Sequence, residues 1–326
     1  MSEYQYYEFQ AIDRPLTKRE IQALRGFSSR ASITSTRFVN HYEWGDFKGD
    51  AAAWMEKYFD AFLYLANWGT RELMLRFPRR VLEPKVAKRY CCGEAASVRV
   101  KGDVVILAFF SEEEPGGEWD DGSGWLASLV PMRAAIAAAD YRALYLGWLL
   151  CAQSGEPSQA ATEPPVPPGL RRLTGPLEAF AEFLRIDRDL IAAAAGDGGA
   201  RAPRTVAELL AAAAPLADER RRREAEQAAR EQTRRDRAEA ERRRRYLDEL
   251  AGREAETWRK VDTLIATRRP ADYDEAVRLL ADLCDLAMRD GRAAEVSARI
   301  RGLLAQHARK PSFIDRLRKR GLAGPV

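Results

Sequence analysis

The sequence predicts an α+β or α/β N-terminal domain, followed by an all-α C-terminal half that contains a long charged helix and a helical hairpin module. In residues 1–155, segments rich in aromatic and β-branched residues alternate with segments of helical pattern. Between Asp218 and Arg245 the only apolar residues are alanines, which is typical of a solvated helix. After Arg245, large apolar residues return at helical spacing.

Residues 1–155 are expected to form the α+β head domain. Aromatic and β-branched runs indicate strands, whereas Pro15 with Thr17, and later Asp50, are typical of helix starts. The predicted strands are 4–12, 33–44, 72–77, 97–100 and 104–110. The predicted helices are one from Thr17 to Leu24, one at 51–68, a basic one near 79–90 and one from Met132 to about Cys151. These patterns do not predict the order of the strands.

The segment 51–68, AAAWMEKYFDAFLYLANW, is expected to be a core helix. Apolar side chains, among them Trp54, Phe59 and Phe62, would cover much more of its surface than a single stripe. A helix with so wide an apolar surface must be buried, and we expect it to pack against a sheet.

Residues 156–170 contain five prolines and are predicted to be an extended linker. Proline lacks an amide donor, so such a run does not pack as a helix or a sheet. Binding of an SH3-like partner is the alternative interpretation. Short alanine-rich helices are expected at 176–186, 188–195 and 205–214, and they predict a small helical module over 171–215 without a large core.

A charged helix is predicted over 216–250, of which the part up to Arg245 would be about 45 Å long. Twelve arginines lie between Arg220 and Arg245, and eight carboxylates accompany them from Asp218 onward. Pairs four residues apart with the acid first each stabilise an isolated helix by about 0.2–0.5 kcal/mol. The six pairs are Asp218–Arg222, Glu219–Arg223, Glu226–Arg230, Glu231–Arg235, Glu239–Arg243 and Glu241–Arg245. The segment has no seam of large side chains for a coiled coil.

Residues 251–326 are predicted to be amphipathic helices joined by short turns. Pro270 forces a break between two of them. Trp258 and Val261, followed by ADYDEAV at 271–277, loosely resemble one tetratricopeptide-type unit. A single unit of that kind leaves apolar surface that neighbouring repeats would normally cover, so we expect a partner or a second copy to cover it.

The net charge of +4 is unevenly distributed. Residues 1–155 carry a net charge of −1, residues 156–215 carry −2 and residues 216–326 carry +7. An anionic partner is therefore expected at the C-terminal third. The four cysteines lack paired spacing, the N-terminus does not read as a secretory signal, and the apolar windows are about half as long as a membrane span. These features predict a cytoplasmic protein with reduced thiols and no membrane contact.

Few residues suggest catalysis, and no cofactor or metal is expected. The two histidines, His41 and His307, lie far apart in the sequence, and no CxxC, HExxH, GxxxxGK[ST] or GxGxxG pattern is present. Neither histidine accompanies a GxSxG elbow. Cys91 and Cys92 are interpreted as ordinary thiols, with a nucleophile activated by the nearby basic residues as the alternative.

An acidic segment lies at 112–121, between two apolar segments interpreted as strands. Hard cations such as Mg²⁺ and Ca²⁺ take oxygen ligands, so a metal-dependent enzyme is one hypothesis for this segment. The spacing of a calcium loop is absent, and a solvated acidic hairpin or a contact with the chain's own arginine helix are the alternatives. The carboxylates are Glu112, Glu113, Glu114, Glu118, Asp120 and Asp121.

The arginine-rich helix is interpreted as a strut more than as a nucleic-acid contact. Its carboxylates leave a net charge of only +4 over 28 residues, and no aromatic residue lies among the arginines to stack on unpaired bases. If the helix does bind an anion, its two four-arginine runs are the candidates. They are Arg220, Arg221, Arg222, Arg223, Arg242, Arg243, Arg244 and Arg245.

We therefore expect a non-catalytic interaction, scaffold or adaptor protein whose helical C-terminal module binds an acidic protein or a second copy of itself. Nucleic-acid association through the arginine-rich C-terminal third is the alternative, and the metal-dependent enzyme is the third hypothesis. The residues expected to contact a protein partner are Trp258, Tyr273, Arg309, Lys310, Phe313, Arg316 and Arg320.

Four stretches of the chain resemble an uncharacterised family of bacterial proteins. They are YQYYEFQAIDRPLT, YFDAFLYLANWGTRELMLRFP, EPPVPP and HARKPS, and the resemblance runs over the whole length. It implies a bacterial origin, and it implies no activity, site residue or cofactor.

Overall fold

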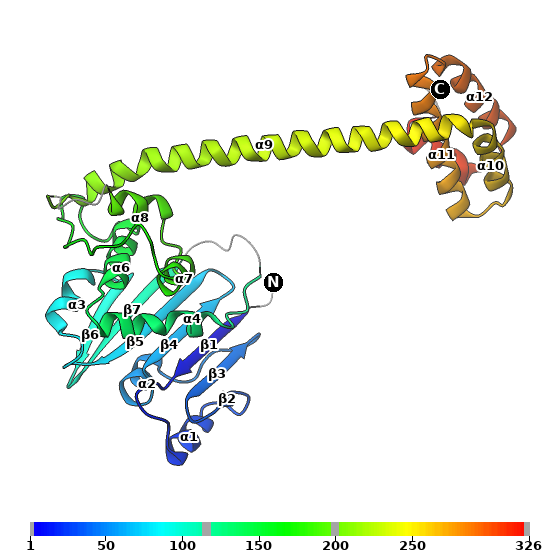
Figure 1. The fold of residues 1–326 in the computed structure, drawn as a ribbon. Coiled ribbons are helices and arrows are strands. Elements are labelled where there is room, and N and C mark those ends of the chain that lie inside the picture. The colour runs from blue at the N-terminus through cyan, green and yellow to red at the C-terminus, as the bar shows by residue number, and fades with distance from the viewer. Residues whose placement is uncertain (1–2, 113–118, 197–201, 323–326) are drawn as a thin grey trace. The chain divides into compact units, whose positions relative to one another are not determined.

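The computed structural model describes residues 3–112, 119–196 and 202–322 (Figure 1). It confirms the predicted fold class, with an N-terminal antiparallel sheet and an all-helical C-terminal half. The chain divides into two compact units, the first ending at Arg222 and the second beginning at Arg223. One helix, α9 (Val206–Gly252), belongs partly to each.

The N-terminal unit is built on a seven-stranded sheet in the order β2-β3-β1-β4-β5-β7-β6. All neighbouring strands are antiparallel, so the domain is α+β and not α/β. The strands are β1 (Gln5–Gln10), β2 (Ser32–Ile33), β3 (Arg37–Tyr42), β4 (Ala61–Ala66), β5 (Thr70–Pro78), β6 (Ala96–Lys101) and β7 (Val104–Glu112).

The prediction of a single helix over 51–68 is wrong. Only α2 (Ala51–Lys57) is helical, and the chain then enters β4, the middle strand of the sheet. In β4, Leu63 and Leu65 face one core and Phe62 faces the other. A strand covered on both faces is apolar at almost every position. Its composition is therefore the same as that of a fully buried helix, and the pattern of apolar residues does not distinguish the two.

Two further elements are shorter than predicted. The strand expected at 33–44 is divided into β2 and β3, and the helix expected from Met132 to Cys151 is divided into α5 (Pro131–Ala137) and α6 (Arg142–Gln153). Ala139, between these helices, has a φ of 64°, which a continuous helix does not allow. A capped α1 (Lys18–Arg25), α3 (Pro84–Tyr90) and α4 (Trp125–Leu129) complete this part of the chain.

Helices cover the two faces of the sheet unequally. On one face, α4 and α6, with α7 (Gly175–Phe183) and α8 (Arg188–Ala195), enclose the larger core (Figure 1). Phe180 packs edge-on against Phe109 of β7 at 4.9 Å. The expectation that residues 171–215 lack a large core is therefore wrong. The other face carries a smaller aromatic core, in which Phe9, Trp54 and Phe59 lie beside α1 and α2.

The proline-rich segment 156–170 forms no helix, as expected, but it contains turns and is held against the helices of its own unit. Glu163 is 6% exposed, and its carboxylate accepts hydrogen bonds from Arg204 at 2.8 and 2.9 Å and from the hydroxyl of Tyr145. The hydroxyl of Tyr90 donates to the carbonyl oxygen of Pro165 at 3.0 Å. A buried ion pair with satisfied oxygens thus fixes the path of this segment.

The C-terminal unit is a helical module, as predicted. The helices that follow α9 are α10 (Glu254–Ala266), α11 (Pro270–Arg289), α12 (Ala293–Gln306) and α13 (Pro311–Lys319). The helix expected at 205–214 and the charged helix are one continuous helix, and Pro215 lies inside it. Because Pro215 has no amide hydrogen, the carbonyl of Ala211 lacks its usual partner in the helix. Both residues are exposed, so water can bind this carbonyl instead.

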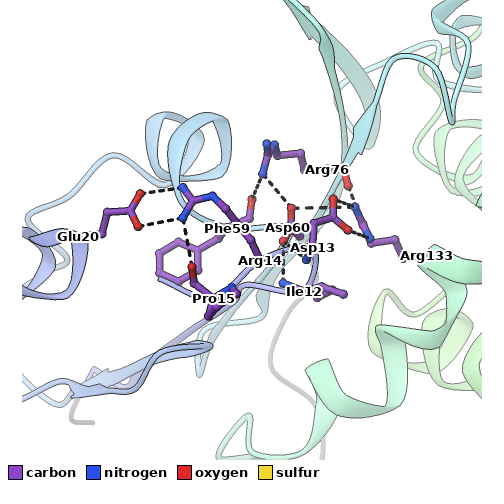
Figure 2. A network of polar contacts seen from close by, with 9 residues as sticks. All are labelled: Ile12, Asp13, Arg14, Pro15, Glu20, Phe59, Asp60, Arg76 and Arg133. Carbon is purple, nitrogen blue, oxygen red and sulfur yellow. Dashed lines mark hydrogen bonds and ion pairs between the residues drawn. The ribbon is translucent and has the colours of Figure 1, made fainter. Parts of the chain in front are cut away.

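A polar network around Asp60 joins the strands of the N-terminal unit to the helices beside them (Figure 2). Asp60 is 2% exposed, and its Oδ2 accepts the amide hydrogens of Ile12 at 2.6 Å and Asp13 at 2.9 Å. Its Oδ1 accepts from Arg76 of β5 at 2.8 Å. Arg133 of α5 holds both oxygens of Asp13, at 2.8 and 2.6 Å. Asp60 is therefore a structural carboxylate whose oxygens are used by the fold.

Replacing Asp60 with asparagine should destabilise the N-terminal unit by about 3 kcal/mol, because Arg76 loses its buried counter-charge. Urea unfolding followed by tryptophan fluorescence measures this loss. Glu20→Gln is the matched control: its pair with Arg14 lies at the surface, glutamine keeps the helix cap, and the expected loss is below about 1 kcal/mol. Equal losses for the two variants would contradict the assignment.

Candidate functional site

An open groove of about 640 Å³ lies on the sheet face that carries the smaller core. The groove is lined by carboxylates, aromatic rings and one amide side chain. These side chains are Glu3, Asp46 and Glu72, then Tyr7, Phe62, Tyr64 and Trp68, then Gln5. The groove thus combines negative charge with aromatic surface.

The strand register brings the central groove residues together. Tyr7 of β1 is paired with Tyr64 of β4, and Tyr64 is paired with Glu72 of β5. Directly paired residues of antiparallel strands point to the same face, so these three side chains form one row across the sheet. The adjacent row, Phe9–Phe62–Met74, is buried in the smaller core. The groove lies where this face changes from apolar to polar.

Hydrogen bonds fix the tyrosines of the groove. The Tyr7 hydroxyl lies 2.8 Å from Gln5 Oε1 and 3.0 Å from Asp46 Oδ1, and the Tyr64 hydroxyl donates to Gln5 Oε1 at 3.1 Å. The Gln5 amide in turn donates to the carbonyl of Gly45 at 3.1 Å. Burial raises the pKa of Tyr7 and raises that of Tyr64 to about 12, so both phenols stay protonated near neutral pH.

Glu72 differs from its neighbours because its carboxyl makes no hydrogen bond or ion pair with any residue that the structure describes. Burial, which penalises the charged form, raises the pKa of Glu72 to about 7. About half of the molecules would therefore carry an ionised Glu72 at neutral pH. This half-buried carboxylate has no counter-charge among the described residues, and it lines a groove open to solvent.

The chemistry of the groove favours organic cations over metal ions. Among the described residues, no three or more histidine, cysteine, aspartate or glutamate side chains are grouped to hold a metal. Asp46 Oδ1 is already used by Tyr7 and by the amide of Phe47, at 3.0 and 2.6 Å. Ammonium and guanidinium groups instead need a carboxylate together with aromatic faces, and the groove supplies both.

The described residues of the acidic segment 112–121 do not line this groove. Glu113, Glu114 and Glu118 lie outside the described residues. Asp120 accepts from the Trp125 indole at 2.9 Å and from the Gly122 amide at 2.9 Å, and Asp121 accepts from Ser123. Both aspartates therefore shape a turn.

Part of the partner-binding set expected in the C-terminal unit is buried. Trp258, Tyr273 and Phe313 are at most 5% exposed and lie in the core of that unit, so they stabilise its fold and are not presented to a partner. The basic members differ among themselves. Lys310 donates to the Ile265 carbonyl at 2.8 Å, Arg316 pairs with Asp274 at 2.6 Å, and Arg309 and Arg320 are exposed.

The arginines of α9 are partly neutralised by nearby acids. Arg220 pairs with Asp189, Arg221 with Asp218, and both Arg244 and Arg245 with Glu241. Arg243 reaches Asp282 and Asp285 of α11 and does not pair with Glu239. Of the predicted acid-first pairs, Glu226–Arg230 and Glu241–Arg245 are seen. Arg222 and Arg242 have no ion pair among the described residues, whereas Arg223 does have an interaction partner.

The two histidines belong to different units of the chain. His41 is exposed on β3 and stacks on Tyr4 at 6.2 Å. His307 packs edge-on against Phe313 at 6.1 Å, and burial lowers its pKa.

Comparisons with known proteins assign no family to this chain: no family model, curated protein or solved structure matches it. Within the described residues, no helix has the length and hydrophobicity needed to cross a membrane.

Sequence reasoning missed the groove around Glu72. The only local signal is that Glu72 begins the predicted strand 72–77 and alternates with Leu73, so it must face away from the larger core. The neighbouring Tyr7 and Tyr64 come from other strands, and without the strand order no pattern places them beside Glu72.

Glu72→Gln should stabilise the protein at pH 8 relative to wild type, and by less at pH 5. The folded-state pKa of about 7 lies above the usual value of 4.5, so the unfolded chain loses this proton first as pH rises. The ionised Glu72 then costs on the order of 3 kcal/mol above pH 7, and glutamine avoids this cost. Urea unfolding of both proteins between pH 5 and pH 8 measures the difference. The exposed Glu43→Gln serves as control, and a difference independent of pH would contradict the prediction.

Proposed function

We propose that the protein works by binding, and that its N-terminal unit recognises a positively charged organic group, an ammonium or a guanidinium, in the groove around Glu72. The observation that carries this proposal is a partly buried carboxylate without a counter-charge among the described residues, set in a solvent-open groove. A basic side chain of a partner protein is the ligand that this chemistry fits.

The energetics of Glu72 favour a cation. The free protein already bears the desolvation cost of the ionised Glu72. An opposite charge within hydrogen-bond distance would offset much of this cost. The cation would return the carboxyl to its ionised form. Ligand binding near neutral pH would therefore release a proton from Glu72, and affinity would rise with pH through the range near 7.

The aromatic side chains add a second attraction. Tyr7 is buried and Tyr64 is half-buried, both are held by Gln5, and Trp68 is 38% exposed at the groove. Rings that are already ordered lose little entropy when a cation is placed over them. Such contacts discriminate a cation with an organic surface from a small hydrated metal ion.

The C-terminal unit would contribute a second contact of opposite charge. Arg309, Arg318, Lys319 and Arg320 are exposed at and near α13. Such a basic surface would favour an acidic partner protein and speed its association, as expected for an adaptor. Binding of a second copy of the chain through the acidic groove would be the self-associating version of the same function.

Wild-type protein should bind Nα-acetyl-lysine amide or Nα-acetyl-arginine amide at pH 8, and Glu72→Gln should bind about 10–100-fold more weakly, as expected for the loss of a charge-assisted hydrogen bond. Isothermal titration calorimetry at pH 7 in buffers of different ionisation enthalpy should show release of about half a proton per bound ligand. The matched control Glu43→Gln should bind like wild type. Equal affinities of wild type and Glu72→Gln, or no binding of either amide, would refute the proposal.

Nucleic-acid binding by α9 is the second candidate function. Residues 221–240 are all exposed, and Arg234, Arg235 and Arg237 have no ion pair among the described residues. Three neighbouring guanidinium groups that have no ion pair among the described residues are able to neutralise phosphates.

If this second function holds, duplex DNA should bind with an affinity that falls steeply as salt rises. Replacing Arg234, Arg235 and Arg237 with glutamine should reduce the slope of log affinity against log salt by about 3, because about one counterion is released per neutralised phosphate. Fluorescence anisotropy of labelled DNA measures the slope. An unchanged slope, or DNA binding too weak to detect at low salt, would exclude this function for α9.

A further inference from the structure

A second groove, of about 500 Å³, lies where β5 ends and the chain turns into α3. It is at the opposite end of β5 from Glu72. Three of its five lining side chains are positively charged and one is a carboxylate. The lining residues are Arg79, Glu83, Pro84, Lys85 and Lys88. We call this hollow the basic groove, because its charge is opposite in sign to that of the groove around Glu72.

The turn that carries Arg79 is held by the fold. Arg79 donates its amide hydrogen to the carbonyl of Asp103, between β6 and β7, at 2.7 Å. Val81 donates its amide hydrogen to the carbonyl of Pro78 at 2.8 Å. The next side chain, Leu82, is 1% exposed and packs in the larger core. The backbone of one wall of the basic groove is therefore fixed by hydrogen bonds and by packing.

Helix α3 forms the other wall and is attached through its apolar side. Ala87 and Tyr90 are buried in the larger core. Lys85 and Lys88 are three residues apart, so they are neighbours on the helix surface, and both are exposed. This spacing brings the two lysines to the same groove that Arg79 lines from the preceding turn.

The segment 79–90 carries five exposed basic residues and one acid. None of the five forms an ion pair with a residue that the structure describes; they are Arg79, Arg80, Lys85, Lys88 and Arg89. The acid, Glu83, is also exposed, makes no hydrogen bond as the cap of α3, and has no ion pair within the same described ranges. Positive charges gathered in this way repel one another, and a multiply charged anion would relieve the repulsion.

We propose that the basic groove binds the phosphate groups of a small soluble polyphosphate anion through Arg79, Lys85 and Lys88. The proposal rests on three cations that line one groove from two walls and have no ion pair among the described residues. It does not depend on the groove around Glu72.

The chemistry of a phosphate chain matches these donors. The planar guanidinium of arginine binds two phosphate oxygens at once, and the ammonium of lysine binds an oxygen as a compact point charge. Three positive charges also suit a chain of phosphates better than a single carboxylate. None of the five residues that line the groove is aromatic, so the ligand would be held by its phosphates and not by stacking.

The burial of α3 disfavours a lipid surface as the source of the phosphate. A basic helix that binds a membrane inserts its apolar side into the headgroup region. The apolar side of α3 is already used, because Ala87 and Tyr90 lie in the core of their own unit. A soluble anion needs only the basic side, and it can enter the groove between the two walls.

Tripolyphosphate should bind the full-length protein at low salt, and isothermal titration calorimetry measures its affinity. The affinity should fall as NaCl is added, because the groove is open to solvent and its charges are screened. The double variant Lys85→Gln with Lys88→Gln should bind about 10-fold more weakly, as expected for the loss of charge-assisted hydrogen bonds. Both positions are exposed, so this variant should fold. Arg79→Gln is an independent test with a similar expected loss.

Lys18→Gln with Arg19→Gln is the matched control and should bind like wild type. It removes the same two positive charges from exposed positions of the same unit, and neither residue has an ion pair in the part of the chain that the structure describes. Absence of tripolyphosphate binding, undiminished binding by the Lys85/Lys88 and Arg79 variants, or an equal loss in the control would overturn the proposal. Binding only to phosphatidylcholine vesicles that contain phosphatidylserine, and not to tripolyphosphate, would also overturn it.

Discussion

The N-terminal unit depends on the buried carboxylate of Asp60. This residue lies where α2 has ended and β4 is about to begin, and its two oxygens bind the amides that follow β1 and the guanidinium of β5. The central strand β4 is covered on both faces by apolar side chains, which specify burial but not where the chain must turn. The directional bonds of Asp60 supply that information. An ionised carboxylate tolerates such burial because each of its bonds carries charge or replaces a water.

The sequence predicts elements well where the determinants are local. Three helices are specified by residues that lie a few positions apart in the sequence, and the structure has helices at these places. The signals are the capping box at Thr17 and Glu20, the acid–arginine spacing of α9 and the amphipathic pattern of α11. The helix predicted over 51–68 failed because a central strand and a buried helix share one composition. Only Asp60, a charged residue amid this apolar run, marks the change of structure, and its partners Ile12 and Arg76 are distant in sequence.

The candidate site could be predicted less well than the fold, because its parts come from different strands. Alternation around Leu73 places Glu72 on the face opposite the larger core, but the same pattern describes any solvent-facing glutamate. Its contact with Tyr64 requires the register of β4 against β5, and Tyr7 requires that of β1 against β4.

Asp60 and Glu72 are two carboxylates of the N-terminal unit that differ in their polar partners. Both are withdrawn from water, but Asp60 has two amides and a guanidinium as partners, whereas Glu72 has none among the described residues. Uncompensated burial costs stability, and a glutamine at position 72 would keep the shape of the side chain without the charge. Folding alone therefore gives no reason for a glutamate there, because the fold would be more stable without it at neutral pH. The cationic ligand that we propose would give one, since it would supply a counter-charge that the described residues do not.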